Sequence, residues 1–457
     1  MNNVIRPEGL LERYHTTRCQ LGFDSGVVVS ARYASGEPLT KAHIYGALKY
    51  AISQQANLGV QIDVTQKVPV FTRLPSVDLS RVVTIAKPSE NLKDVFDTNF
   101  RTQFETGTEN PLWRVAVLPD NTVAFAYHHA IADGQSGLAF HRSFLAGLNQ
   151  LSYAAPEGED VVAVPTNLSM EPPAEQLTNT SVSFWTLLRT IFGLFAPVSW
   201  TAGASAWTGN PVINEPSLVT NVHLWETTPA DSAAFLRVCK SHKTTLTGAY
   251  HTIGTVVLSR VLSTMVIPKK YKTIGTSVAV SMRRFTGTSP EAMCDQASAI
   301  YTNVPFLRPP PDGRPGESFP WSAAVECSNR LRNGLSKCRE VIGLIKFLFY
   351  GNPRDYWFGQ LGKKRERTLE YSNLGRLAPS KDKGEWEIES MFFGQCDSIV
   401  GSAMKISIVG SPSGAVNTVF TWGEGAMDDA VADAFIAGFK AEFSSLLSQD
   451  PDGKLTV

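Results

Sequence analysis

Hydrophobic and polar residues alternate with the period of a β-strand in several parts of the first third of the chain. The segment 121–127 alternates large apolar residues with small or polar ones and predicts a buried strand. Short strands are likewise predicted near 113–118 and, as a continuous apolar run, over 26–33. Helical spacing predicts helices from Thr40, as N-cap, to about Gln54, and over 92–104. We therefore expect a mixed α and β unit here.

The second half of the chain shows the same mixture of patterns. It predicts strands over 219–225, 273–280, 402–410 and 415–421, and helices over 232–241, from Thr245 or Thr247 to Leu262, within 321–349 and over 428–447. No internal repeat is evident. We expect two lobes, 1–154 and 217–457, because 457 residues exceed the size of one ordinary core.

The segment 155–216 between these lobes is rich in Pro, Thr, Ser and Gly and predicts a crossover linker. It contains an apolar stretch, 184–207, that is broken by Arg189 and Pro197. These interruptions leave it without the roughly 20 uninterrupted apolar residues that a spanning helix needs. Three interpretations stay open: it packs on a lobe, lines a substrate entrance, or makes peripheral contact with a membrane.

Charge and cysteine usage narrow the class of protein. The chain has 42 basic and 42 acidic residues, which disfavours a polynucleotide partner. Lys363, Lys364, Arg365 and Arg367 predict a solvated loop, although the phosphate of a small cofactor could bind there. The six cysteines are widely spaced and the amino terminus resembles no signal peptide, so we expect free thiols and a cytoplasmic protein, with membrane association left open. We also expect the protein to be a monomer.

The strongest chemical signal is the segment from His128 to Gly134, which follows the predicted strand 121–127 directly. His129 and Asp133 are four residues apart, Gly134 is expected to permit a tight turn, and Ser136 is expected to cap the next helix, which ends near Leu151. An imidazole held between a strand and a helix in this way can act as a general base. We expect Asp133 to have a geometric role, through hydrogen bonds or a pair with a distant arginine.

Two alternatives exist for these histidines. They could cap backbone groups at the strand end, or a His and Asp pair could ligate zinc. No CxxC or HExxH motif supplies further ligands, so we expect no metal. The other histidines occur singly and are expected to be structural or on the surface; they are His15, His43, His141, His223, His242 and His251.

The pattern His129-x-x-x-Asp133-Gly134 resembles the active-site motif of the CoA-dependent acyltransferase superfamily, which includes chloramphenicol acetyltransferase. Within it, the chain is most similar to the fungal alcohol acetyltransferase family. Further segments that carry the resemblance are 14–23 (YHTTRCQLGF), 372–375 (SNLG) and 420–423 (FTWG). The resemblance implies an α/β (α+β) fold of two chloramphenicol acetyltransferase-like lobes with an active-site tunnel at their interface.

The resemblance also implies roles for residues in the second lobe. Arg283, in the segment 279–283 (AVSMR), is the expected partner of Asp133, and Ser281 stands where the family often has aspartate. Ser372 or Asn373 could donate a hydrogen bond to the oxyanion, or could merely form a turn. The segment 420–425 departs from the DFGWG element of the plant enzymes, and Trp422 is expected to be a packing residue.

The activity implied by the resemblance is transfer of an acyl group, most simply acetyl, from acyl-CoA to the hydroxyl of a hydrophobic molecule such as a terpenoid, a polyketide or a long-chain alcohol. His129 is the general base, with His128 and Gly134 in support, and no tightly bound cofactor is needed. Two alternatives use the same tunnel: condensation with an acyl donor tethered to a carrier protein, and a non-acylating protein that binds or cyclises a ligand.

Overall fold

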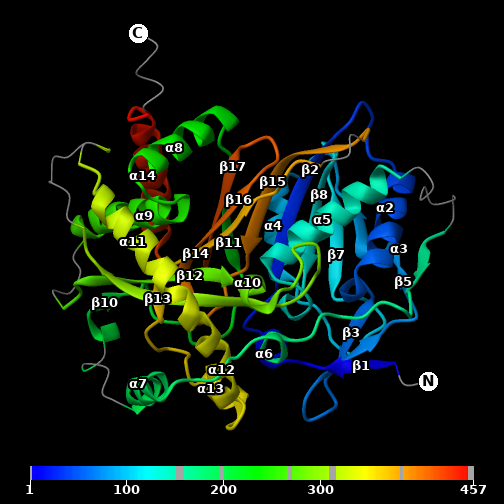
Figure 1. Cartoon of the computed structure of the whole chain (residues 1–457), viewed down its shortest axis with the longest axis horizontal. Coiled ribbons are helices and arrows are strands. Elements are labelled where there is room, and N and C mark those ends of the chain that lie inside the picture. The colour runs from blue at the N-terminus through cyan, green and yellow to red at the C-terminus, as the bar shows by residue number, and fades with distance from the viewer. Residues whose placement is uncertain are drawn as a thin grey trace.

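The computed structural model describes residues 3–150, 159–195, 200, 202–265, 270–307, 315–316, 318–380 and 384–450. Most of its strands form two large sheets, and helices pack on both (Figure 1). Two smaller sheets pair β1 (Val4–Pro7), β4 (Val70–Arg73) and β3 (Val60–Asp63), and β5 (Ser76–Asp78) with β9 (Val161–Ala163).

The first large sheet contains the strand that leads to the histidine pair. Its order is β15 (Glu387–Gln395), β2 (Val27–Ala34), β8 (Thr122–Tyr127), β7 (Trp113–Val117) and β6 (Val83–Ile85). β8 is antiparallel to both β2 and β7, with Tyr127 opposite Val27 on one side and Trp113 on the other. Because β8 is central and buried throughout, the histidines at its end start from a fixed backbone.

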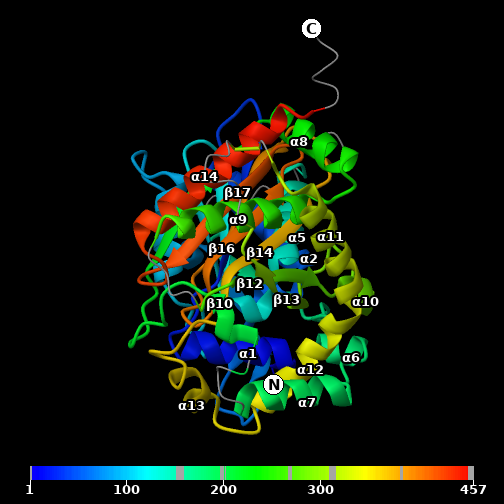
Figure 2. The ribbon, with the colours of Figure 1, turned by 90° about the vertical axis from the view of Figure 1, so that its left-hand side faces the viewer.

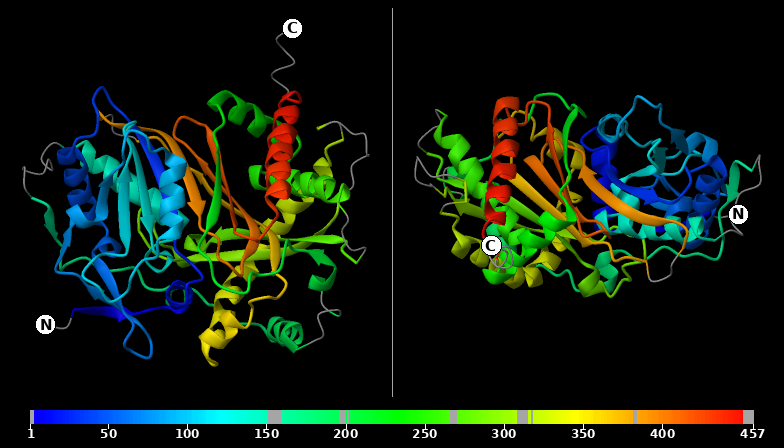
Figure 3. Two further views of the ribbon diagram at one scale, coloured as in Figure 1. Left: turned by 180° about the vertical axis from the view of Figure 1, so that it is seen from behind. Right: turned by 90° about the horizontal axis from the view of Figure 1, so that it is seen from above.

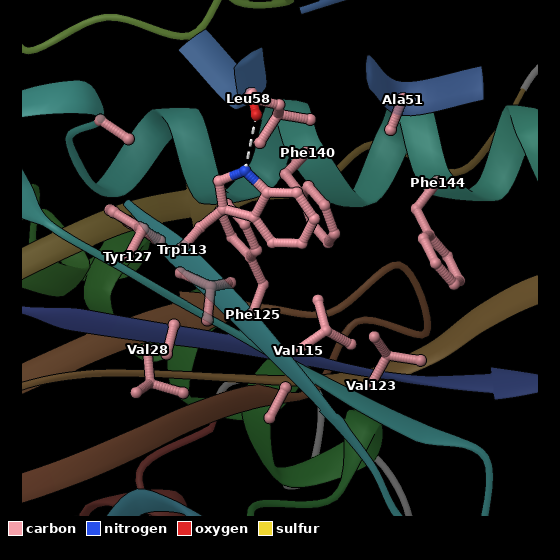
Figure 4. Packing of buried hydrophobic residues seen from close by; sticks show 14 of the residues in the cluster. Val28, Ala51, Leu58, Trp113, Val115, Val123, Phe125, Tyr127, Phe140 and Phe144 are labelled. Atoms are coloured by element: carbon pink, nitrogen blue, oxygen red, sulfur yellow. Dashed lines mark hydrogen bonds between the residues drawn. The ribbon is translucent and has the colours of Figure 1, made fainter. Parts of the chain in front are cut away.

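A dense aromatic cluster joins this sheet to helix α5 (Gly134–Leu148). The rings of Phe125 on β8 and Phe140 on α5 are stacked, with 3.7 Å between their centroids. Trp113 is fully buried and donates its indole hydrogen to the carbonyl of Leu58 at 2.8 Å (Figure 4). Strand β8 and helix α5 are therefore held rigidly on either side of the segment 128–133.

The second large sheet lies in the other half of the molecule. Its order is β10 (Ala206–Trp207), β12 (Thr273–Ser281), β14 (Arg367–Arg376), β16 (Ser402–Gly410), β17 (Val416–Gly423) and β11 (Thr220–Trp225), with β13 (Ala297–Pro305) antiparallel to β12. Helices α8 (Pro229–Ser241), α9 (Leu246–Ser263) and α14 (Asp429–Leu447) pack together on this sheet.

Strand β15 connects the two halves. It belongs to the C-terminal part of the sequence, yet it pairs with β2 in the first sheet and also contacts β16 and β17 of the second (Figure 3). The boundaries 1–154, 155–216 and 217–457 stay a prediction, but they assign this strand to the half whose main sheet it does not join.

The remaining helices complete the two halves. They are α1 (Leu10–Gln20), α2 (Lys41–Gln54), α3 (Leu79–Val82), α4 (Leu92–Arg101), α6 (Ala174–Leu177), α7 (Phe184–Phe195), α10 (Arg283–Thr286), α11 (Trp321–Gly334), α12 (Cys338–Leu348) and α13 (Pro353–Phe358). Helices α7, α12 and α13 lie at one end of the molecule in two perpendicular views (Figures 1 and 2).

The structure confirms most of the predicted elements to within a few residues. Thr40 caps α2 and Thr245 caps α9, as expected. The predicted strands near 113–118, 122–127, 219–225, 273–280, 402–410 and 415–421 correspond to β7, β8, β11, β12, β16 and β17. No prediction was made for β13 or β15. The end of the predicted helix at Leu151 and parts of the linker lie outside the described residues.

All six cysteines are free thiols and are buried. Among the described residues, no helix is both long and apolar enough to cross a membrane.

Candidate active site

The segment between β8 and α5 links the predicted strand directly to the predicted helix. A short 3₁₀ helix, η2 (His129–Ile131), follows β8, and Asp133 then caps α5. The Oδ1 atom of Asp133 accepts a hydrogen bond from the backbone N–H of Ser136 at 3.0 Å. The expectation that Ser136 caps this helix is therefore wrong: an aspartate accepts the free N–H groups of the first turn equally well and lies three residues earlier.

Gly134 does not form the tight turn that was expected of it, but it lies in close contact with the second sheet. It is the first residue of α5 and does not have the positive φ that a glycine turn would need. A Cβ at this position would lie 2.4 Å from Cδ2 of Leu374 on β14. The absence of a side chain thus lets the second sheet approach the start of α5 closely.

The carboxylate of Asp133 points into a buried network that joins the two halves. Its Oδ2 atom lies 2.5 Å from Nη1 of Arg283, and both side chains are almost fully buried. Arg283 also donates to the hydroxyl of Ser136 at 3.2 Å and to the carbonyl of Ala292 at 3.1 Å. Burial alone would raise the pKa of Asp133, but Arg283 outweighs it and the pKa is lowered.

This network also fixes the backbone on both sides of Asp295. The N–H of Asp133 donates to the carbonyl of Cys294 at 2.9 Å, and the N–H of Cys294 donates to the hydroxyl of Ser136 at 3.0 Å. On the other side, the N–H of Gln296 donates to Oδ2 of Asp133 at 3.2 Å. The capping residues of α5 therefore place the Asp295 side chain beside η2.

Asp295 faces two histidines from different elements. Its Oδ1 atom lies 3.6 Å from Nδ1 of His129, and its Oδ2 atom lies 3.7 Å from Nε2 of His15 on α1. Its side chain is fully buried, and neither oxygen has a hydrogen-bond partner among the described residues. The two imidazole rings stack in parallel, with 3.8 Å between centroids and 3° between planes.

The charges in this cluster shift its ionisation. Burial raises the pKa of Asp295 to about 6, although His129 opposes the rise. Burial by itself would lower the pKa of His129, but Asp295 and Asp24 outweigh it and the pKa is raised. Burial and the neighbouring His129 lower the pKa of His15 well below its usual value. His129 is therefore the ring that becomes protonated first as the pH falls.

His128 does not share this environment. Its Nδ1 atom accepts the N–H of Ala130 at 3.0 Å, and burial lowers the pKa of its ring to about 4. His128 thus caps η2, which is the role that the sequence offered as the alternative for this histidine pair.

The cluster of His15, His129 and Asp295 brings three metal-ligating groups together, with donor atoms within 4.8 Å of one another. This grouping is not visible in the sequence, because the three residues lie far apart along the chain. The lone pair of an imidazole nitrogen lies in the ring plane, and two parallel, stacked rings share no such plane. One ring would have to rotate before both could coordinate the same ion.

His15 and His129 line a cavity of about 290 Å³ between the two halves. Gly26 and Val27 contribute to its wall from the first half, and Ser277 and Glu370 from the second sheet. An apolar part of the wall is formed by residues of α12, α13 and neighbouring segments, namely Tyr14, Tyr301, Ile342, Ile345, Tyr356 and Trp357.

Ser372 and Asn373 are not among the described residues that line this cavity. They lie within strand β14, and the backbone directly after them is turn-like, with a positive φ of 75° at Gly375 and irregular pairing with β16 between 373 and 376. The side-chain amide of Asn373 donates to the hydroxyl of Thr247 at 3.1 Å, and its carbonyl oxygen accepts the N–H of Gly375 at 2.8 Å. The structure therefore gives no support to either residue as an oxyanion donor.

The basic residues that follow α13 lie in different environments. Lys364 donates to the backbone carbonyls of Gly203 and Ala206, and Arg365 is buried against the carbonyl of Ile399. Arg367 lines the cavity, and its guanidinium lies over the ring of Tyr301 at 5.0 Å. The expectation of a solvated loop is therefore wrong for Arg365, which is buried, whereas Lys364 and Arg367 both line the cavity.

Sequence comparison places these observations in a family. A family model described as alcohol acetyltransferase matches residues 91–443. A probable alcohol acetyltransferase, crmB of Aspergillus fumigatus, is 24% identical over 92% of this chain and 96% of its own length. The probable alcohol acetyltransferase FCK4 of Fusarium pseudograminearum is also 24% identical, over 79% and 77% of the two chains.

Solved structures show the same fold at lower identity. The trichothecene 15-O-acetyltransferase TRI3 of Fusarium sporotrichioides superposes with a TM-score of 0.69 at 11% identity, covering 96% of this chain and 94% of its own. A condensation domain of the calcium-dependent antibiotic synthetase gives a TM-score of 0.61 at 14% identity, with 97% of each chain covered. The predicted α/β fold of this superfamily is confirmed.

Proposed function

The chain belongs to the alcohol acetyltransferase family, and from this we propose that it transfers an acyl group, most simply acetyl, from acyl-CoA to a hydroxyl of a hydrophobic small molecule, with His129 as the general base. The observation that carries the proposal is the position of His129. Its ring faces the cavity while its Nδ1 atom faces the buried carboxylate of Asp295. Nε2 is then the nitrogen that remains for the substrate.

The proposed reaction needs one proton carrier. Nε2 of His129 accepts the proton of the acceptor hydroxyl as its oxygen attacks the thioester carbonyl. The tetrahedral intermediate then collapses, the bond from carbon to sulfur breaks, and the CoA sulfur takes the same proton from His129. The products are the ester and free CoA, and the enzyme returns to its starting protonation state.

Asp295 has the positioning role in this proposal. A carboxylate at 3.6 Å from Nδ1 favours the tautomer with the proton on that nitrogen and stabilises the imidazolium that forms during attack. Asp133 and Arg283 act one step further away, because their network holds residues 294 and 296. This agrees with the expectation that the role of Asp133 is geometric.

The two kinds of cavity wall suit the two substrates. Arg367 can meet the phosphate groups of CoA, since a guanidinium binds phosphate oxygens in pairs. The aromatic and aliphatic part, which includes Ile342 and Trp357, suits a hydrophobic acceptor. The family description favours a free CoA donor over a donor tethered to a carrier protein.

The compartment and oligomeric state are part of the same proposal. Six buried free thiols support a reducing, cytoplasmic location and argue against a disulfide framework. Activity as a monomer is a further part of this proposal.

The direct test is release of free CoA thiol from acetyl-CoA by the purified protein in the presence of a panel of terpenoid, polyketide and long-chain alcohols. We expect thiol release that depends on the alcohol, together with a product heavier by one acetyl group. Transfer only from an acyl group loaded on a carrier protein would contradict the CoA donor. Binding of the alcohols without thiol release from any acyl-CoA would contradict an acyltransferase.

A further inference from the structure

Helix α7 presents its apolar side to solvent. Phe184, Trp185, Leu188, Ile191 and Phe192 are between 44% and 76% exposed. At 100° per residue these side chains fall within an arc of about 120° on the helix. A surface helix of a globular protein normally turns such an arc towards the core. This helix does the reverse.

The opposite side of α7 faces the protein and carries two threonines, with Leu187 half-buried beside them. Ser183, just before the helix, donates its hydroxyl to Oε2 of Glu340 on α12 at 2.9 Å, and Thr186 and Thr190 are half-buried. A Cβ at Gly343 of α12 would lie 2.0 Å from the carbonyl of Thr180, so the segment before α7 is packed directly on α12. These contacts hold the apolar arc outward.

We propose that α7 and the adjoining end of α12 form a docking face for a lipid bilayer whose surface carries anionic headgroups. The docking face consists of the exposed apolar residues of α7 together with Phe347, near the C-terminal end of α12, and Tyr350, just after that helix, which are also exposed. The 12 residues of α7 span about 18 Å, so the helix lies in the interface and does not cross the bilayer. Aromatic side chains are suited to that depth.

The charges around the docking face favour a bilayer over a second copy of this chain. The exposed basic residues on α7, on α12 and next to them are Arg189, Lys337, Lys346 and Arg354. Asp355 is the exposed acidic residue in the same described elements, and Glu340 is engaged by Ser183. A symmetric dimer would bring this positive rim against itself, whereas anionic headgroups complement it.

Helix α12 contributes to the wall of the cavity and also leads to the docking face. Ile342 and Ile345 of α12 and Tyr356 of α13 line the cavity, while Phe347 and Tyr350 belong to the docking face. A hydrophobic acceptor dissolved in the bilayer would therefore reach the cavity along α12. This last step rests on the proposed function, whereas membrane binding does not.

Flotation of the full chain with lipid vesicles tests the proposal without any activity assay. Vesicles of phosphatidylcholine with about 30 mol% phosphatidylserine should carry the protein upward, and binding should weaken in phosphatidylcholine alone or at high salt. The double variant Trp185→Gln/Phe192→Gln should lower the partition coefficient by about tenfold or more. The matched control is Ile85→Gln/Leu236→Gln, which changes two exposed apolar residues elsewhere and should bind as wild type.

Light scattering and thermal melting of each variant separate the other outcomes. Unchanged melting temperatures with lost flotation support the proposal. It is overturned if wild type does not float with anionic vesicles, or if the double variant and wild type float equally. It is also overturned if the wild-type protein is a dimer that the double variant converts to monomer, since the face would then belong to a second copy.

Discussion

His15 and His129 stack face to face above one buried carboxylate, that of Asp295, although α1 and η2 supply the two rings from opposite ends of the first lobe's sequence. Two imidazole rings with centroids 3.8 Å apart cannot both be positively charged without strong repulsion. The pKa of His15 is lowered and that of His129 is raised, so the carboxylate serves the ring that has been proposed as the base.

The first prediction concerns pH. His129 must be neutral to accept a proton, and its pKa is raised above 6.5, so kcat/KM should rise with pH and reach half its maximum above pH 6.5. Protonation of Asp295, whose pKa is about 6, removes the orienting charge and should steepen the acid limb. A pH profile of thiol release checks this. A value of kcat/KM that is constant between about pH 5 and pH 8 would contradict it.

The second prediction is that Asp295→Asn lowers activity but stabilises the fold at neutral pH. Burial raises the pKa of Asp295 from 3.8 in the unfolded chain to about 6. The contribution of the protonated carboxyl to the free energy of unfolding is therefore fully present below pH 3.8. It is lost as the pH rises through about 6. Asparagine cannot ionise and escapes this loss, which is worth on the order of 1–3 kcal/mol.

Thermal melting at two pH values and the rate of thiol release measure the effects of Asp295→Asn. The melting temperature of the variant relative to wild type should increase between pH 4 and pH 8, and the rate should fall by at least about tenfold. A variant that keeps the wild-type rate would remove Asp295 from the mechanism. A constant difference in melting temperature would contradict the buried, high-pKa carboxylate.

The third prediction concerns the ion pair between Asp133 and Arg283. Removing either partner leaves a buried charge, so Asp133→Asn and Arg283→Gln should each destabilise the fold by about 3–5 kcal/mol. The control is Arg32→Gln, which breaks an exposed pair with Glu389 and should cost less than about 1 kcal/mol. Denaturant unfolding gives these values. An Asp133→Asn variant of unchanged stability whose rate nevertheless falls steeply would assign Asp133 a chemical role.

The local pattern of the sequence predicts the strand and the helix that flank the segment 128–133. Alternation predicted β8, helical spacing predicted α5, and the family resemblance supplied Arg283 as the partner of Asp133, at 2.5 Å in the structure. The cap was misplaced from Asp133 to Ser136 because both residues are good caps and the chain offers no local signal to choose between them.

The residues around His129 could not be predicted in the same way. Asp295 lies 166 positions after His129, in a segment without a motif, and it reaches the site only because residues 294 and 296 bond to the cap of α5. The sequence groups His15 with the structural or surface histidines, since it occurs singly. It lies within the family-like segment 14–23, which was the one signal that could have marked it.

The fourth prediction tests the binding of CoA phosphates. Arg367→Gln should raise KM for acetyl-CoA by about tenfold with little change in kcat, because the proposed function has this cavity-lining guanidinium bind a CoA phosphate away from the reacting atoms. Arg354→Gln, an exposed arginine outside the cavity lining, is the matched control and should leave KM unchanged. Steady-state kinetics with varied acetyl-CoA measures both. A loss confined to kcat would place Arg367 elsewhere in the mechanism.

The central claim is that His129 is the general base, and the most direct measurement is thiol release by His129→Ala with its folding checked by thermal melting. His128→Ala serves as the comparison, since that ring caps η2 and does not line the cavity. We predict that His129→Ala lowers kcat/KM by about 10² to 10⁴ with a melting temperature close to that of wild type. A folded His129→Ala protein that releases thiol at the wild-type rate would contradict the account.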